Sequence, residues 1–368
     1  MTMDGTASML ASKDSRSPRI LISRLSAIGD CILTMPLATA LRRAFPGAFI
    51  AWGVQGASAP LIERHPCVDL AMCISKQEFS SPLGLWKLRQ RLQAQKFDIA
   101  IDPQGLTKSA LVSWLSGAPR RIGFARPVAR EISPWLQTDL VHSRQPHVVD
   151  RYLELLKPLG VKEPQVEFQF PSDAAARVQL TPFLDQPRLR QGFAVVNPGA
   201  GWDSRLWPVE RYGEVAKFLA SAHRLSTVVV WAGERERAWA EEIAKFSENN
   251  AILAPKTSLL ELGELLRHAR IFVGSDTGPL HMAAAVGVSC VGIHGPTRPE
   301  NSGAYGTGHK AVQAYYQGGT SRERRSAGNE AMLAIATKDV CTACNEILER
   351  PGARAHSAAQ PVSQSQAA

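Results

Sequence analysis

The chain has 368 residues, which is too long for one typical hydrophobic core and favours two domains. Its 45% hydrophobic and 20% charged content is that of an ordinary globular protein, and no apolar run reaches the length of about 18 residues that a membrane-spanning helix needs. The formal net charge of +9 favours anionic partners. Zinc-finger spacing, RNP-type aromatic motifs and continuous basic helices are missing, so nucleic acid is not an expected partner.

The first half of the chain alternates apolar strands with helical stretches. Residues 1–18 are polar and of mixed charge, and we expect a disordered leader there. The elements expected next are strand Arg19–Ser23, a helix over Cys31–Ala44, strands Phe49–Val54 and Phe97–Ile101, and a helix over Ser109–Leu115. This alternation predicts a parallel sheet covered by helices, and we assign residues 19–175 to an N-terminal Rossmann-like domain.

The turn Ser26–Asp30 connects the first strand to the first helix. Gly29 allows tight geometry, and Asp30 is expected at the carboxyl edge of the sheet, beside a helix start. A carboxylate there can take a proton from a sugar hydroxyl as that hydroxyl attacks an anomeric carbon. Asp30 can also serve as a simple helix N-cap, and both interpretations stay open.

The second half of the chain repeats the alternation after a polar connection over Val166–Gly192. We assign residues 190–328 to a C-terminal Rossmann-like domain. Its expected strands are Phe193–Asn197, Thr227–Ala232, Ala251–Ala254, Ile271–Gly274 and Ser289–Ile293, and its expected helices are Glu210–Ser221, Arg235–Phe246 and Leu259–Arg267. A last helix within residues 329–350 is expected to pack back on the N-terminal domain, and the Ala/Ser/Gln-rich residues 351–368 are expected to form a disordered tail.

The eight residues Gly274–His281 form the most informative turn of the second half. They follow an apolar strand and precede a helix, with Pro279 near the first helical position. The first turn of a helix leaves backbone N–H groups unpaired and carries partial positive charge, so it suits a phosphate. Thr277 can add a hydroxyl donor, and Asp276 can accept from a sugar hydroxyl. Simple capping of the helix by either side chain is the competing interpretation.

Four polar turns of the second half, after Val196, Trp231, Val273 and Ile293, follow strands of one expected parallel sheet. Such turns meet at the carboxyl edge, where open α/β sheets bind ligands. The dinucleotide fingerprint G-x-G-x-x-G and the phosphate loop G-x-x-x-x-G-K-[ST] are both missing. Hydride transfer and P-loop kinase chemistry are therefore disfavoured. The six cysteines show neither a disulfide framework nor a metal-ligand pattern, so no metal site is predicted.

The chain resembles glycosyltransferase family 9, the lipopolysaccharide heptosyltransferases. The matching stretches appear in the family's order and span nearly the whole expected ordered region. They are Ser-Ala-Ile-Gly-Asp-Cys-Ile-Leu-Thr-Met-Pro within Arg19–Phe45, Asn197-Pro-Gly-Ala through Trp207-Pro208, Trp231-Ala-Gly-Glu, and Gly274–His281 continuing to Gly295-Pro-Thr.

The resemblance implies a glycosyltransferase B fold, with two Rossmann-like domains whose parallel sheets face a central cleft. It implies an inverting, metal-independent enzyme without a cofactor that moves heptose from ADP-heptose to a lipopolysaccharide inner-core or related glycan. Asp30 would be the general base, and Arg205, where the family usually has lysine, would stabilise the departing diphosphate. The donor-binding residues implied are Asp276, Thr277, Gly278, His281, Asn197, Gly199 and an acid after Trp231-Ala-Gly, with Glu234 favoured over Glu236.

The resemblance also gives the basic clusters a partner. Arg120, Arg121 and Arg126 would attract an anionic, lipid-linked glycan acceptor, and the protein would work in the cytoplasm, in peripheral contact with the inner membrane. Two alternatives stay open: the same fold with another nucleotide-sugar donor, and a catalytically silent protein that binds sugar nucleotides. His281 can be a packed histidine or a phosphate contact. Trp202 and Trp207 can each stack on adenine, with structural packing favoured for Trp207.

Overall fold

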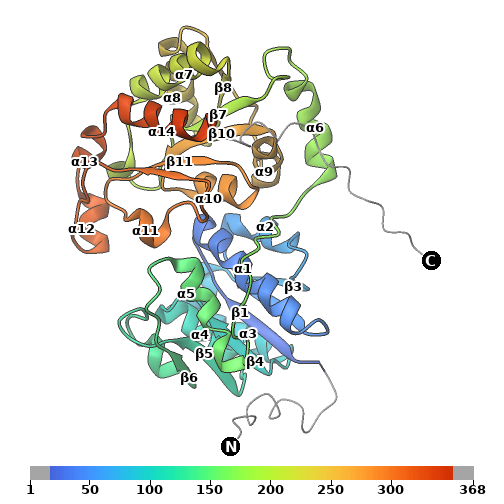
Figure 1. The fold of residues 1–368 in the computed structure, drawn as a ribbon. Coiled ribbons are helices and arrows are strands. Elements are labelled where there is room, and N and C mark those ends of the chain that lie inside the picture. Colours follow the sequence, from blue (N-terminus) through green and yellow to red (C-terminus); the bar gives the residue numbers. More distant parts are fainter. Residues whose placement is uncertain (1–16, 351–368) are drawn as a thin grey trace, which may run out of the picture. The chain divides into compact units, whose positions relative to one another are not determined.

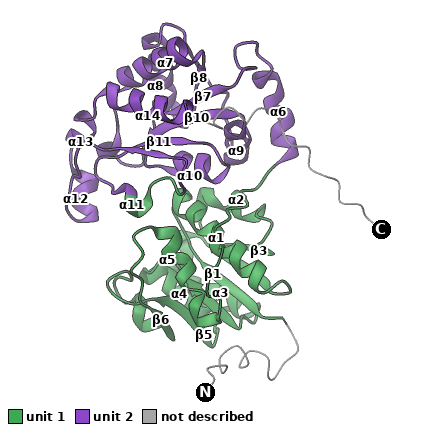
Figure 2. Ribbon diagram, in the orientation of Figure 1, with its two compact units in different colours: residues 1–172, 300–305 green, residues 173–299, 306–368 purple. Residues whose placement is uncertain are grey.

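The computed structural model describes residues 17–350, which divide into two compact units (Figures 1 and 2). Unit 1 runs to Ser172 and includes Glu300–Tyr305, whereas unit 2 covers Asp173–Pro299 and the chain from Gly306 onward. The expected disordered tail over residues 351–368, and residues 1–16 of the expected leader, lie outside the described residues.

Unit 1 contains a parallel sheet of six strands within the described residues, in the order β3-β2-β1-β4-β5-β6. The first strand, β1, therefore lies next to the fourth, β4, and the strand order reverses between them. Such a reversal is the usual ligand position of an open α/β sheet. The strands are β1 (Arg19–Ser23), β2 (Phe49–Val54), β3 (Leu70–Cys73), β4 (Ile99–Asp102), β5 (Arg120–Phe124) and β6 (Asp139–Val141).

Helices cover the sheet of unit 1 because each crossover between parallel strands needs a long connection. On one face, α3 and α4 bury Leu88, Leu92, Val112 and Leu115 against strand residues that include Leu21. The helices are α1 (Ile28–Ala44), α2 (Ala59–Glu63), α3 (Pro82–Gln93), α4 (Thr107–Leu115) and α5 (Val148–Glu154), and the short 3-10 helix η4 (Ser133–Leu136) follows β5.

A buried carboxylate, that of Asp102, closes β4 and shapes the loop after it. Its Oδ1 accepts hydrogen bonds from the backbone N–H groups of Gln104 and Gly105, each at 3.0 Å. Its Oδ2 accepts from Ser133 Oγ and Gln137 Nε2, each at 3.3 Å. Burial raises the pKa of Asp102 to about 6, although these hydrogen bonds act in the opposite direction.

We expect Asp102→Asn to remove a pH dependence of folding stability. The pKa of Asp102 in the folded chain, about 6, lies above the ordinary value of 3.8, so its stabilising contribution is fully present below the ordinary value and is lost as pH rises through 6. Relative to the variant, the wild type should lose about 3 kcal/mol of unfolding free energy across this range. Urea unfolding at about pH 4 and pH 7 measures the difference. If the unfolding free energies of the wild type and the variant changed by the same amount between these pH values, the raised pKa of Asp102 would be contradicted.

Unit 2 contains a second six-stranded parallel sheet within the described residues, in the order β12-β11-β10-β7-β8-β9. Here β7 lies next to β10, and Val196 and Asn197 of β7 pair with Val273 and Gly274 of β10. The strand order reverses at this pair, as it does at β1 and β4 in unit 1. The strands are β7 (Phe193–Asn197), β8 (Ser226–Val229), β9 (Ala251–Leu253), β10 (Ala269–Ser275), β11 (Cys290–Ile293) and β12 (Lys310–Val312).

The helices of unit 2 begin and end where local sequence signals are strong. A capping box starts α9, because Ser258 Oγ accepts from Glu261 N at 3.2 Å and Glu261 Oε2 accepts from Ser258 N at 2.5 Å. The helices are α6 (Ala174–Leu184), α7 (Val209–His223), α8 (Gly233–Phe246), α9 (Leu259–Arg267), α10 (Gly278–Ala285), α12 (Ser321–Ser326), α13 (Glu330–Leu333) and α14 (Thr337–Leu348), while α11 (Pro299–Ser302) lies where the chain returns to unit 1.

Two expectations about domain organisation need correction. The helix α14 packs on α7, and Val340, Cys344 and Ile347 belong to the same buried cluster as Val273 of unit 2, rather than to the N-terminal domain. The polar stretch expected as a connection contains α6, which packs on α9 and belongs to unit 2. Each helix buries one side in unit 2, and sequence periodicity alone does not identify the surface on which a helix packs.

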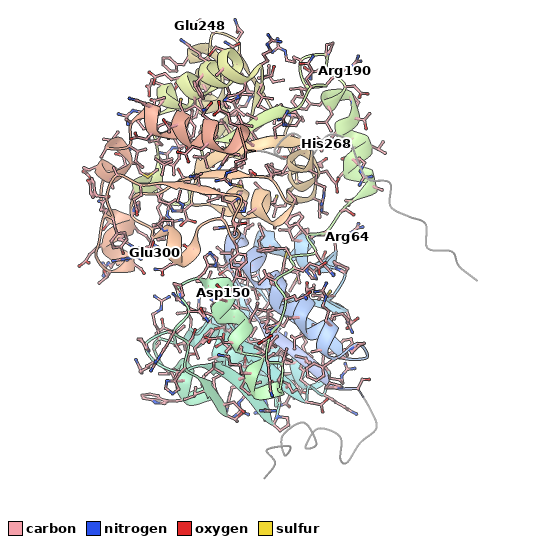
Figure 3. All side chains as sticks on the ribbon, viewed as in Figure 1. Arg64, Asp150, Arg190, Glu248, His268 and Glu300 are labelled. Carbon is pink, nitrogen blue, oxygen red and sulfur yellow. The ribbon has the colours of Figure 1, made fainter. Side chains whose placement is uncertain are left out.

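The segment Glu300–Tyr305 returns to unit 1 and is held there by polar and aromatic contacts. Asp150 on α5, labelled in Figure 3, accepts a hydrogen bond from Tyr305 Oη at 2.7 Å. His147 Nε2 bonds Gly303 O at 3.1 Å, and the rings of His147 and Tyr305 lie 4.9 Å apart in an edge-to-face arrangement. Residues distant in sequence therefore complete unit 1.

Candidate functional site

Asp30 lies in the first turn of α1, beyond the carboxyl end of β1. Ala27 occupies the N-cap position, and its backbone N–H donates to Asp30 Oδ2 at 3.3 Å. The other oxygen, Oδ1, pairs with Arg24 Nη2 at 2.9 Å. The Asp30 side chain is 47% exposed, so the carboxylate is held by Arg24 and Ala27 N and is still accessible to solvent. It helps to cap the helix and remains accessible, so the two interpretations of this residue are compatible.

Arg24, which the sequence did not single out, is the buried cation behind Asp30. Its Nη2 also donates to Tyr152 Oη at 2.9 Å, and its Nη1 donates to Pro103 O at 3.4 Å. Burial alone would lower the pKa of Arg24, but the charge of Asp30 outweighs it and the pKa is raised. Burial raises the pKa of Tyr152 to about 12. This cluster therefore holds Asp30 beside a permanent positive charge.

The three arginines expected to bind an acceptor do not lie together. Arg120 and Arg121 are the first residues of β5 and pair with Ile99 and Ala100, so they lie at the amino edge of the sheet, opposite the edge of Asp30. Arg120 Nη2 binds Asp139 Oδ1 at 3.0 Å, and Arg121 donates to backbone carbonyls. This placement argues against acceptor binding by Arg120 and Arg121, because both bind structural partners at the sheet edge opposite Asp30.

Arg126, in contrast, follows the carboxyl end of β5. It is exposed, and its Nη2 donates to Glu131 O at 2.7 Å. Of the three arginines, Arg126 is therefore the one on the sheet edge of Asp30.

The turn after β10 starts α10 with Thr277 at the N-cap position. The Thr277 side chain accepts no hydrogen bond from the first helical turn. Instead, its Oγ1 donates to Ser275 O at 3.2 Å and accepts from Asn197 Nδ2 at 3.3 Å. Asn197 ends β7 and also donates to Gly199 O at 3.2 Å, so it links the two turns at the strand reversal. The start of α10, including Gly278, is thus held in place without being capped by a side chain.

Asp276 is buried beneath this turn. Its Oδ1 lies 3.2 Å from His281 Nε2, and its Oδ2 lies 3.8 Å from Arg205 Nη1. Burial by itself would raise the pKa of Asp276, but the hydrogen bond and charge of His281 and the charge of Arg205 outweigh it, and the pKa lies well below its usual range. The carboxylate is 4% exposed and already committed, so it organises its neighbours more readily than it reaches a ligand.

Arg205 lies in the 3-10 helix η6 (Asp203–Arg205) and reaches the start of α10. Its Nη1 donates to Asp276 O at 2.6 Å, and Ser275 Oγ donates to Arg205 O at 2.8 Å. Its guanidinium lies 3.8 Å from the ring centre of Trp202, which also has Arg325 at 4.8 Å. Trp202 therefore packs against two cations. Arg325 comes from α12, which sequence reasoning did not connect with this turn.

The two acids after Trp231-Ala-Gly lie in different environments. The Glu234 side chain is 89% exposed and lies 3.9 Å from Arg237. Glu236 accepts from Ala232 N at 2.7 Å, and burial raises its pKa. Its carboxylate lies against Gly199, where an added Cβ would come within 2.3 Å of Oε1. Both acids lie in the first turn of α8, at the carboxyl edge, but it is Glu236, and not the favoured Glu234, that lies against Gly199 in the turn after Asn197.

The two units define a class of protein. Unit 2 gathers a cation, an uncapped helix start and a half-buried acid at the strand reversal, which suits a nucleotide diphosphate. Unit 1 presents an open carboxylate at its own strand reversal, which suits a proton acceptor. This combination of folds and groups is that of a transferase acting on nucleotide-activated sugars. In residues 17–350, no group of three or more His, Cys, Asp or Glu side chains is arranged to hold a metal ion.

Comparison with known proteins identifies the family. The family model for glycosyltransferase family 9 (heptosyltransferase) matches residues 85–331. The lipopolysaccharide heptosyltransferase 1 of Escherichia coli K12 is 31% identical over 307 residues, covering 80% of this chain and 93% of that protein. Solved structures of the E. coli heptosyltransferase WaaC with ADP and with ADP-2-deoxy-2-fluoro heptose each share 27% identity and a TM-score of 0.70, and cover 89% of this chain and 99% of theirs.

The chain belongs to glycosyltransferase family 9 and is a glycosyltransferase. The predicted α/β class and the glycosyltransferase B type of fold, with a six-stranded parallel sheet in each unit within residues 17–350, are confirmed. Among the described residues, no helix is both long and apolar enough to span a membrane.

Proposed function

We propose that this enzyme transfers heptose from ADP-heptose to the inner core of lipopolysaccharide or a related glycan, with inversion at the anomeric carbon and without a metal ion. The observation that carries the proposal is the placement of Arg205 at the start of α10, 2.6 Å from Asp276 O. The resemblance to enzymes crystallised with ADP and an ADP-heptose analogue supports the choice of donor.

In this proposal, unit 2 binds the donor diphosphate. The backbone N–H groups at the start of α10, from Gly278 onward, and the guanidinium of Arg205 face the phosphate oxygens, with Thr277 beside them. Asp276 acts through its neighbours, because its buried carboxylate holds Arg205 and His281 in place. Glu236 accepts from a hydroxyl of the nucleotide ribose.

Asp30 of unit 1 acts as the general base. It takes the proton of an acceptor hydroxyl while the oxygen of that hydroxyl forms a bond to the anomeric carbon of the donor. The bond from that carbon to the diphosphate oxygen breaks, its electron pair stays on the diphosphate, and ADP leaves. A single displacement of this kind inverts the anomeric configuration. Arg205 and the dipole of α10 meet the charge that develops on the leaving group, which gives a metal-independent route.

The acceptor in this proposal is an anionic, lipid-linked glycan, with Arg126 as a candidate contact. In this proposal the enzyme works in the cytoplasm, at the cytoplasmic face of the inner membrane in which the acceptor is anchored. A panel of ADP, UDP and GDP sugars, followed by thermal unfolding, tests the donor, because a ligand that binds the folded chain raises its apparent stability. A clear rise with UDP or GDP sugars and none with ADP compounds would overturn the donor assignment.

We expect Glu236→Gln to weaken ADP binding and the matched change Glu234→Gln to leave it nearly unaltered. The reason is that Glu236 lies at the Asn197 turn, whereas Glu234 points into solvent. Loss of a charged hydrogen-bond acceptor to the ribose should reduce affinity roughly tenfold to a hundredfold. Isothermal titration with ADP measures both variants. Equal affinity of the two variants would remove Glu236 from the donor site.

A further inference from the structure

One layer of unit 1 leaves large apolar side chains in solvent. It consists of α3 and α4, which pack on one face of the sheet, and η4, which packs on α4. Its exposed apolar side chains are Leu83 (60% exposed), Trp86 (57%), Trp114 (48%), Ile132 (43%) and Trp135 (77%). Together with the exposed basic residues Lys87, Arg89, Lys108, Arg126 and Arg130, they form what we call the Trp face.

The concentration of these side chains is unusual for the molecule. Within residues 17–350, ten large hydrophobic side chains are exposed, and five of them, including all three tryptophans, belong to the Trp face. The other five come from separate elements, as singly exposed apolar residues usually do. Clustered exposed apolar side chains mark surfaces of interaction.

Contacts along the carboxyl edge show that the parts of the Trp face adjoin. Lys108 Nζ at the start of α4 lies 6.0 Å from the ring centre of Phe79, three residues before α3 begins. Thr107 N donates to Glu131 Oε2 at 2.9 Å, which holds the segment containing Ile132 at the same end of α4. On α3, which packs against α4, Arg91 turns toward Glu78 and Cys73 O, and Trp86, five residues earlier, lies on a different side of the helix.

The charge of this stretch is almost entirely positive. From Ser80 to Arg130 the sequence has nine Lys or Arg residues and two carboxylates, Asp98 and Asp102. Asp102 is buried, and Asp98 accepts from Arg19 N at 2.8 Å. Arg91 and Arg120 pair with Glu78 and Asp139, which lie outside this stretch, and the other seven basic residues still outnumber its two carboxylates. Glu131, the next acid along the chain, accepts from Thr107 N, and the nearby charges of Arg130 and Lys108 help to lower its pKa, so it offsets part of their charge and leaves the face net positive.

We propose that the Trp face binds the surface of an anionic lipid bilayer. Tryptophan prefers the headgroup level of a membrane, and basic side chains around it are attracted to anionic lipid. A second copy of this chain is a poor occupant, because the face would bring like charges together. The face carries binding to lipid by itself, and this binding does not depend on the donor or on the transfer reaction.

The position of the Trp face also suggests how a membrane-anchored acceptor reaches the enzyme. This suggestion rests on the proposed function, whereas lipid binding by the face does not. Leu25 N, just before the Asp30 turn, donates to Gln104 Oε1 at 2.9 Å, and α4 begins three residues after Gln104. The Trp face therefore adjoins the sheet edge that carries Asp30. A bilayer held by the Trp face would bring an acceptor anchored in that bilayer to the edge where its hydroxyl loses a proton.

The test compares the full chain with the double variant Trp86→Ser/Trp135→Ser, using Phe246→Ser in unit 2 as the control for losing an exposed aromatic side chain. Sedimentation with vesicles of phosphatidylglycerol and phosphatidylethanolamine, or of phosphatidylcholine alone, measures binding. We expect the wild type and the control to bind the anionic vesicles and to bind the zwitterionic vesicles only weakly. Both proteins should dissociate from the anionic vesicles as the salt concentration is raised. The double variant should bind the anionic vesicles at least tenfold more weakly, and Lys87→Gln/Lys108→Gln should lower binding about fivefold per lysine.

Transfer assays separate this proposal from the proposed function. The double variant should lose activity on an acceptor embedded in vesicles and keep wild-type activity on the same acceptor freed of its acyl chains. If no variant or wild type transfers heptose, the proposed function fails while the vesicle result still stands. Equal vesicle binding by wild type and double variant would overturn the lipid proposal. So would a wild type that binds oligonucleotides in preference to vesicles, or a double variant that changes from dimer to monomer in light scattering.

Discussion

Asp30→Asn should reduce turnover by about 100-fold to 10,000-fold while ADP binds as tightly as in the wild type. The substitution keeps the size of the side chain and its hydrogen bond from Ala27 N, but an amide does not accept a proton from a hydroxyl under these conditions. Because the donor groups of unit 2 are untouched, the loss should appear in kcat rather than in ADP affinity. Steady-state transfer assays and titration with ADP give the two quantities.

The variant also removes the charge partner of a buried arginine, and a matched control separates that effect. Asp69→Asn breaks another arginine–carboxylate pair of unit 1, in which Arg42 Nη2 lies 2.6 Å from Asp69 Oδ2, and should leave turnover near the wild-type rate. Thermal unfolding of both variants shows how much stability each pair contributes. Undiminished turnover in Asp30→Asn would exclude the residue as the base.

The sequence predicted the fold well where strands are long and apolar. The expected strands Arg19–Ser23 and Phe49–Val54 have the observed bounds, and β10 is found around the expected Ile271–Gly274. It missed β5, since that strand begins with Arg120 and Arg121, whose charge suggested a binding surface. In the folded chain, those arginines lie at the amino edge and satisfy Asp139 and backbone carbonyls. Composition alone does not distinguish an arginine that binds a partner from one that closes a loop.

The candidate site divides in the same way. Turns after strands placed Asp30, Asn197 and Thr277 at carboxyl edges, because topology dictates where such turns lie. Arg24, directly after β1, was missed because its role depends on a contact with Tyr152, which is 128 residues further along the chain. The choice between Glu234 and Glu236 likewise depended on which face of α8 meets the Gly199 turn, which a short motif does not specify.

The burial of Asp276 favours a different role from the one its motif suggested. Its position in the motif suggested direct contact with the donor sugar, but its side chain is 4% exposed and bound to His281 and Arg205. A buried carboxylate of this kind holds the neighbouring cation, Arg205, in a fixed position, because hydrogen bonds and ion pairs are strong where water is excluded. In the proposed mechanism, the residue that meets the developing charge is Arg205, and the second large effect is expected there.

Arg205→Ala should lower kcat by about 100-fold to 1000-fold, because it removes a preorganised cation from the point where the diphosphate gains charge. Arg205→Lys should recover part of this loss: lysine keeps the charge but lacks the planar fork that donates to Asp276 O and packs on Trp202. Arg325→Ala is the matched control, since Arg325 stacks on the same ring at 4.8 Å and is exposed. Single-turnover rates with saturating donor isolate the transfer step from binding. If Arg205→Ala transferred heptose within threefold of the wild-type rate, the start of α10 would have to stabilise the leaving group without it.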